Sequence, residues 1–398
     1  MRKLCLYIIL FVAFTLSSKS NSLYANNLSD SKKEIKIAVL MPLFYENIDD
    51  LAFNEYNIDE RRNRNYKCFT YISFYEGIRI ALDKFDNKDC KISLYVFDVG
   101  ENDIKKTKQA LEYEYLKDMD MIIALVFKQS FNLISDFCLD NKIALINPMS
   151  TDENILMNPY VFKIQPDDYS ISVSLLKYIQ TKHSNDRIIV LYDDSFVETD
   201  VVNLWKENLP KQTTKWTILN YRKNSIKLKK YINKSDTNLV INLTKKNTNN
   251  ENKTYSQEII NTLRTSKCNI ELFGVYDWLE YIGSNFSILQ DMNFSFSLPY
   301  YNDYTNMNFI ELVKIYRENF KIDPDNIYAS IGYDIIDYFV PLLKRWGKEF
   351  VAKPFDTNQD KMINRYKWNR KEDNKGWQNT NVTIYKLDNY KIKSCWSY

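Results

Sequence analysis

The sequence predicts an α/β protein with two similar lobes, each a parallel β-sheet flanked by helices. Three observations support this fold class. Apolar segments of strand length alternate with amphipathic helical segments from residue 34 onward. The strand segments are almost uniformly apolar, which is typical of parallel strands covered on both faces. The alternation is interrupted near 160–166 and then restarts, so a 398-residue chain divides into two lobes of ordinary size with a cleft between them.

The first alternation begins with an apolar strand at 35–41 and a helix at 74–85, in which Phe74, Ile78 and Leu82 share one face. It continues with further strands and helices at 92–97, 104–116, 121–127, 131–139 and 143–146. A short extended segment at 160–164, ended by Gln165-Pro166, predicts the crossing to the second lobe.

The second alternation contains strands at 187–192, 215–220, 238–243, 270–275 and 293–298. Its helices are predicted at 169–180, 199–209, 226–232, 256–265, 309–320 and 327–346, and residues 382–387 predict hairpin strands that close the fold. The predicted boundaries are an N-terminal segment at 1–25, a first lobe at 34–160 with part of 295–345, and a second lobe at 166–294 with the tail 346–390. The polar, irregular segment 47–66 predicts an insertion near the cleft mouth.

The N-terminus predicts export. Arg2 and Lys3 precede an apolar run at 4–16, and a polar stretch then leads to Ala25 as a small residue at a cleavage site. This order is typical of a secretory signal peptide, and the run is shorter than the roughly 20 residues that a membrane-spanning helix needs. An uncleaved anchor is the alternative. Cys5 precedes the apolar run, where a lipoprotein cysteine would follow it. We therefore expect a location in the periplasm or cell envelope.

The composition argues against several classes of function. A net charge of +3 without a basic block argues against nucleic acid as a partner. The cysteines after Cys5 form no CxxC pair, so no metal site is expected. The chain has one histidine, His183, in a polar turn that indicates a solvated surface position, and it has no glycine-rich phosphate loop. The adjacent carboxylates Asp193 and Asp194 follow a strand and are interpreted as a solvated pair. The expectation is a protein without catalytic residues or cofactors.

Four segments together resemble the type 1 periplasmic binding proteins. They are Lys36–Leu43, Phe74–Gly77 at the start of a helix, Ala144–Thr151 with its Asn-Pro turn, and Gly332–Phe339 in a late helix. The resemblance is strongest to the leucine/isoleucine/valine-binding branch and to the exported receptor-like proteins of this fold in Bacteroidetes. It implies two Rossmann-like lobes joined by a hinge that closes on a ligand.

In that family, hydroxyls and backbone N–H groups where strands meet helix N-termini hold the carboxylate of the ligand. By position, the resemblance implies that Ser130, Ser150 and Thr151 hold the anionic end and that Tyr45 and Tyr276 form walls. The full set of candidate ligand-binding residues is Tyr45, Lys128, Ser130, Ser150, Thr151, Asp193, Tyr276 and Asp277.

The chain departs from the family pattern at two places. Lys128 stands at a hydroxyl position, where it can pair with an acidic ligand or with Asp152 or Glu153 of the chain itself. No acidic residue follows Ile241 to receive the ammonium of an amino acid, although Asp277 could substitute. The first interpretation is an extracytoplasmic solute-binding protein for an amino acid or related carboxylate, with an ABC permease or an envelope protein as partner. The alternative is an envelope scaffold or protein-interaction module with a degenerate cleft.

Overall fold

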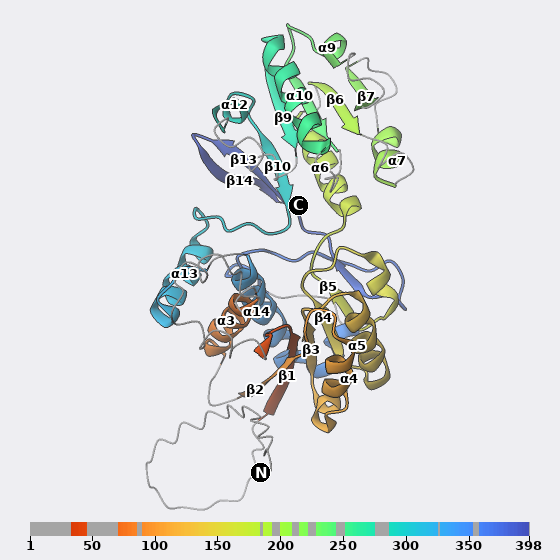
Figure 1. Ribbon diagram of the computed structural model, residues 1–398, viewed down its shortest axis with the longest axis vertical. Helices are drawn as coiled ribbons and strands as arrows, with labels where there is room; N and C mark the ends of the chain where they lie inside the picture. The colour runs from red at the N-terminus through yellow and green to blue at the C-terminus, as the bar shows by residue number, and fades with distance from the viewer. Residues whose placement is uncertain are drawn as a thin grey trace, which may run out of the picture.

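The computed structural model describes residues 33–45, 71–85, 90–183, 186–192, 200–208, 215–221, 228–243, 251–274, 286–324, 327–352 and 358–397. The predicted signal peptide at 1–25 and the predicted insertion at 47–66 lie outside these ranges. No helix within the described ranges has the length and apolarity needed to cross a membrane. Figure 1 shows two bodies of sheet and helix stacked along the long axis.

The first lobe is built on a seven-stranded sheet with the order β11-β12-β5-β4-β3-β1-β2. Its strands are β1 (Lys33–Met41), β2 (Cys90–Asp98), β3 (Met121–Ala124), β4 (Ala144–Asn147), β5 (Val161–Lys163), β11 (Trp368–Asn369) and β12 (Trp377–Asn379). Neighbouring strands are parallel except β11 and β12. The carboxyl ends of β1, β3 and β4 therefore lie along the same edge of the sheet.

Helices cover both faces of this sheet. On one face lie α3 (Ile72–Asp83), α13 (Met307–Phe320) and α14 (Tyr328–Trp346), followed by the 3-10 helix η8 (Gly347–Ala352). On the other lie α4 (Ile104–Leu111), η3 (Glu114–Asp118) and α5 (Lys128–Asn141). Because side chains alternate along a strand, β1 sends Ile37 and Val39 into the first core and Ala38 and Leu40 into the second.

The second lobe repeats this arrangement with the strand order β14-β13-β10-β9-β8-β6-β7. Its strands are β6 (Arg187–Tyr192), β7 (Trp216–Asn220), β8 (Asn238–Asn242), β9 (Ile270–Gly274), β10 (Ser295–Leu298), β13 (Thr383–Asp388) and β14 (Lys391–Ser397). One face carries α6 (Asp168–Lys182) and α7 (Asp200–Glu207). The other carries α9 (Leu228–Tyr231), α10 (Glu251–Ser266) and α12 (Phe286–Asp291). The predicted α/β fold class with two helix-flanked sheets is confirmed.

The chain passes between the lobes at β5–α6, at β10–α13 and at β12–β13 (Figure 1). The predicted assignment of the whole tail 346–390 to the second lobe is wrong for its first part. The β11–β12 hairpin joins the first sheet, where β12 pairs in parallel with β5. Aromatic packing accounts for this placement, because the rings of Trp368 and Trp377 lie 5.4 and 6.5 Å from that of buried Phe162. Residues 383–397 then form the predicted hairpin in the second sheet.

Candidate functional site

A cavity of about 330 Å³ lies at the carboxyl edge of the first sheet, beyond β1, β3 and β4. Its lining combines aromatic rings with polar groups of both charges. The aromatic residues are Tyr71, Phe127, Phe131 and Tyr328, and the polar residues are Glu101, Lys128, Asn147, Ser150 and Asp152. Aromatic walls with a few convergent polar groups are typical of small-molecule sites.

Asp98, the last residue of β2, fixes the loop after β1. Its Oδ1 accepts hydrogen bonds from the N–H groups of Leu43 at 3.0 Å and Gly100 at 3.3 Å, and its Oδ2 accepts one from Tyr45 at 2.9 Å. The Tyr45 side chain is 62% exposed and does not line the cavity. Tyr45, predicted to form a wall, therefore projects outside the cavity.

The aromatic wall comes instead from Tyr71, just before α3, and Tyr328, at the start of α14. Their rings meet edge to face at 5.4 Å. The Tyr71 hydroxyl donates to Oε1 of Glu101 at 3.0 Å. Burial and this hydrogen bond to Glu101 raise the pKa of the Tyr71 hydroxyl, so it remains a neutral donor. Glu101 thus has a fixed orientation at the cavity lining, and sequence patterns alone did not identify it.

The N-terminus of α5 is already occupied by a side chain of the protein. Oδ1 of Asn102 accepts hydrogen bonds from the N–H groups of Gln129 at 3.1 Å and Ser130 at 3.2 Å. Ser130 is fully buried, and its Oγ accepts from the Thr107 hydroxyl at 2.9 Å. Ser130 was predicted to hold a ligand, but this is wrong for the described structure, because its hydroxyl ties α4 to α5 and does not line the cavity.

The turn after β4 is organised by Asn147, whose Oδ1 accepts from the N–H groups of Met149 at 3.1 Å and Ser150 at 2.7 Å. Ser150 lines the cavity, and its Oγ accepts from the N–H of Asp152 at 3.1 Å. Thr151 is exposed and outside the lining, and its carbonyl accepts from the Lys163 ammonium at 3.1 Å. Of the two predicted hydroxyls, only Ser150 is available to the cavity.

Lys128, the first residue of α5, pairs with Asp152, one of the partners proposed for it from the sequence. Its Nζ lies 3.3 Å from Oδ2 of Asp152, with the two side chains 69% and 36% exposed. The backbone N–H of Asn154 and the Lys128 ammonium hold the pKa of Asp152 below its usual range. A pair this exposed contributes only about 0–1 kcal/mol, so a ligand carboxylate can replace Asp152 beside Lys128 at small cost.

Three predicted site residues of the second lobe, Asp193, Tyr276 and Asp277, lie outside the described residues.

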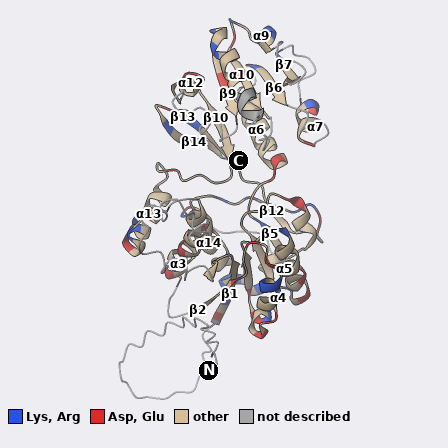
Figure 2. Ribbon diagram, viewed as in Figure 1, with Lys and Arg blue, Asp and Glu red and all other residues tan. Residues whose placement is uncertain are grey.

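The interpretation of His183 as a solvated surface residue is wrong, because its side chain is only 11% exposed. Nδ1 of His183 lies 2.9 Å from Oδ2 of Asp186, and its ring lies 5.4 Å from that of Tyr178. Within the described ranges, no group of three or more His, Cys, Asp or Glu side chains is arranged to hold a metal ion. Basic and acidic residues are interspersed over both lobes (Figure 2).

Comparison with solved structures identifies the fold. A putative branched-chain amino acid ABC transporter protein from Rhodospirillum rubrum matches with a TM-score of 0.61 and 10% identity, over 91% of this chain and 100% of that one. The chain has the fold of the type 1 periplasmic binding proteins.

Two further structures agree with this fold. A branched-chain amino acid ABC transporter periplasmic ligand-binding protein from Burkholderia xenovorans matches with a TM-score of 0.55 and 10% identity, over 91% of this chain and 95% of that one. An ABC transporter substrate-binding protein from Desulfitobacterium hafniense, solved in complex with Leu, has a TM-score of 0.51 and 14% identity, over 91% and 100% of the two chains. No protein-family model and no curated protein matches the sequence.

Proposed function

We propose that the protein is an extracytoplasmic solute-binding protein that holds a small polar ligand, an amino acid or related carboxylate, between its lobes. The observation that carries this proposal is the first-lobe cavity, which places Lys128, Ser150 and Glu101 around aromatic walls from Tyr71 and Tyr328. The cavity lies at the carboxyl edge of a parallel sheet, where ligands bind in open α/β folds.

The charges of the cavity suit a ligand that carries both signs. The Lys128 ammonium and the Ser150 hydroxyl can bind a ligand carboxylate once the Asp152 side chain has moved away from Lys128. Glu101, oriented by the Tyr71 hydroxyl at 3.0 Å, supplies a carboxylate for an ammonium group. Glu101 would therefore receive the ammonium group of an amino acid, for which no acidic residue follows Ile241. The second lobe would complete the site when the hinge closes.

The related structures support the same class of ligand. The Desulfitobacterium hafniense protein was solved in complex with Leu, and the Burkholderia xenovorans protein is named a branched-chain amino acid ABC transporter periplasmic ligand-binding protein. The predicted signal peptide would deliver this chain to the compartment in which such proteins function. An ABC permease is the corresponding partner.

Thermal melting of residues 26–398 against amino acids, short peptides, small carboxylates and sugars tests this function. A ligand that binds only the native state at about 100 times its Kd adds about 2.7 kcal/mol of stability. We expect one class, amino acids or small carboxylates, to raise the melting temperature by a few degrees. A flat panel from protein shown by circular dichroism to be folded would contradict the proposal.

A second candidate, an envelope scaffold with a degenerate cleft, is favoured by one specific observation. The backbone N–H groups of Gln129, Ser130 and Ser150 already donate to Asn102 and Asn147. These three N–H groups are therefore not available to bind a ligand carboxylate, which would depend on side-chain donors at this edge of the first lobe. A flat ligand panel together with a stable oligomer or a protein partner captured at stoichiometric amounts would support the scaffold.

A further inference from the structure

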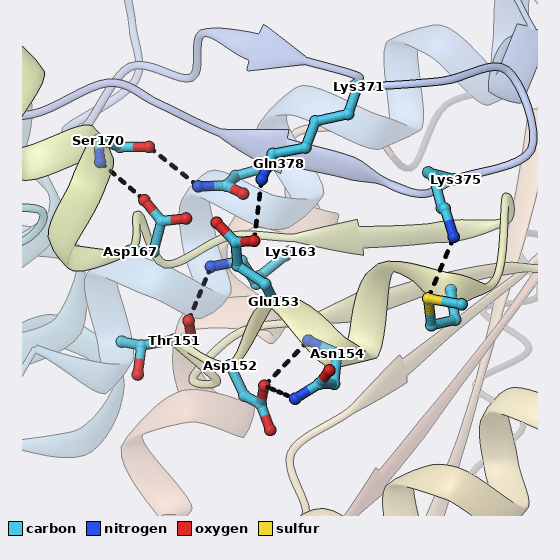
Figure 3. A network of polar contacts seen from close by, with 11 residues as sticks. Thr151, Asp152, Glu153, Asn154, Lys163, Asp167, Ser170, Lys371, Lys375 and Gln378 are labelled. Atoms are coloured by element: carbon cyan, nitrogen blue, oxygen red, sulfur yellow. Dashed lines mark hydrogen bonds and ion pairs between the residues drawn. The ribbon is translucent and has the colours of Figure 1, made fainter. Parts of the chain in front are cut away.

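A second cavity of about 490 Å³ lies at the hinge and shares no lining residue with the first-lobe cavity. One wall is α6 of the second lobe, the other is the β11–β12 hairpin of the first lobe, and the 3-10 helix η4 (Glu153–Met157) lies between them. We call this cavity the hinge groove. Figure 3 shows part of its polar lining, namely Glu153, Asn154, Asp167, Ser170, Lys371, Lys375 and Gln378.

A hydrogen-bonded frame fixes the two walls of the hinge groove to each other. Nε2 of Gln378 on β12 donates to Oγ of Ser170 on α6 at 2.9 Å, and the Ser170 N–H donates to Oδ1 of Asp167 at 2.7 Å. Nζ of Lys371 lies 2.9 Å from Oε2 of Glu153 (Figure 3). The groove therefore has preformed walls that belong to different lobes.

The carboxylates Asp167 and Glu153 are already engaged within this frame. Hydrogen bonds from Glu153 and Ser170 overcome the effect of burial and hold the pKa of Asp167 below its usual range. The hydrogen bond to Asp167 raises the pKa of Glu153. The Lys371 ammonium, 2.9 Å from Oε2 of Glu153, offsets part of the negative charge that these carboxyl groups bring to the groove.

Basic groups face the groove from both walls. Lys177 on α6 is half-buried, Lys367 precedes β11, and Lys375 lies before β12. Lys177 and Lys367 line the same groove from opposite walls, and burial, together with the nearby charge of Lys177, lowers the pKa of Lys367. Nζ of Lys375 contacts the Met157 thioether at 3.2 Å, a weak acceptor. Glu372 also lines the groove, so the lining is not uniformly basic.

A buried hydroxyl provides an independent indication of an occupant. Ser174 on α6 lines the groove and is 1% exposed, and its Oγ has no hydrogen-bond partner among the described residues. A buried polar group without a hydrogen-bond partner destabilises the folded state. Ser174 lies one helical turn from Lys177 on the same face of α6, so a polar ligand next to this hydroxyl would also be next to a cation.

We infer that the hinge groove is a second ligand site, for a small anion with two or more carboxylate or phosphate groups. Such an anion would lie between Lys177 and Lys367 and accept a hydrogen bond from Ser174. Because these residues belong to different lobes, the anion binds best at one interlobe angle. It therefore shifts the equilibrium between open and closed forms.

Isothermal titration of citrate and of inorganic pyrophosphate into residues 26–398 tests this inference and separates carboxylate from phosphate ligands. We expect saturable binding of at least one anion in a buffer of low ionic strength. The double variant Lys177→Gln/Lys367→Gln should bind about tenfold or more weakly, since it removes both charge-assisted contacts to the anion. Ser174→Ala should weaken binding by a smaller factor.

The matched control is Lys105→Gln/Lys108→Gln, which removes two exposed lysines of α4 outside the groove. We expect its affinity for the anion to stay within about twofold of the wild type. Circular dichroism of each variant confirms that it is folded. Absence of binding to wild-type protein, or an equal loss in the control, would overturn the inference. The same titration in Lys128→Met separates this site from the first-lobe cavity, because groove binding should persist there.

Discussion

Replacing Asp334 with Ala is expected to lower the free energy of unfolding by about 3 kcal/mol or more, since each buried polar group left unsatisfied costs about 1–3 kcal/mol. Asp334 lies on α14 and is fully buried. Its Oδ1 accepts from the Ile363 N–H at 2.8 Å, and its Oδ2 accepts from the N–H of Asn364 at 2.8 Å and from Nδ2 of Asn364 at 3.1 Å. Urea unfolding followed by circular dichroism measures the loss.

The same residue makes stability depend on pH. Burial raises the pKa of Asp334 from 3.8 to about 7, against the opposing effect of its hydrogen-bond donors. Between about pH 4 and 7 the folded state holds a proton that the unfolded state has released. The free energy of unfolding therefore falls as pH rises across this range. Asp334→Asn should flatten this fall between pH 4.5 and 7.5. Asp360→Asn, at a side chain 77% exposed, is the control and should keep the wild-type slope. Equal slopes in wild type and Asp334→Asn would contradict the assignment.

Gly332→Ala and Gly77→Ala are each expected to destabilise the first lobe by about 1–3 kcal/mol or more, the usual cost of overpacking. These glycines lie where α3 crosses α14. A Cβ on Gly77 would lie 2.0 Å from the Ala329 carbonyl oxygen, and one on Gly332 would lie 2.3 Å from that of Phe74. Both neighbours are backbone atoms of helices, so neither can move aside without separating the helices. Urea unfolding measures the loss. A change in the free energy of unfolding below about 0.5 kcal/mol, the usual size for surface sites, would show that the two helices are not in close contact at these glycines.

Much of the fold was predictable because the apolar pattern of a short segment is enough to indicate a strand or a helix. The strand 187–192 is found as predicted, since its apolar run fits a strand covered on both faces. The segments Phe74–Gly77 and Gly332–Phe339, which carried part of the family resemblance, turn out to pack against each other. Their glycines permit the close approach of α3 and α14. The β11–β12 hairpin was misassigned, since its place depends on aromatic contacts with the distant residue Phe162.

The site was predicted less completely because it depends on contacts between distant segments. The Lys128–Asp152 pair was one of the proposed alternatives and is confirmed. Ser130 was misassigned because a sequence does not show that Asn102 and Thr107 already occupy that helix end. Tyr71 and Glu101 are 30 residues apart and meet only in the folded lobe. A contact between segments this far apart has no counterpart in the local periodicity of the sequence, so Tyr71 and Glu101 were not predicted as site residues.

The role of the first-lobe cavity as the ligand site is tested by calorimetric titration of the stabilising amino acid or carboxylate into the wild type and three variants. Lys128→Met removes the cation of the first-lobe cavity, Glu101→Gln removes its anion while retaining an oxygen for Tyr71, and Glu114→Gln removes an exposed acid at the opposite edge of the sheet as control. We predict that an amino acid binds about tenfold or more weakly to Lys128→Met and Glu101→Gln. Its affinity for Glu114→Gln should be unchanged. Wild-type affinity in both cavity variants would contradict the claim that this cavity holds the ligand.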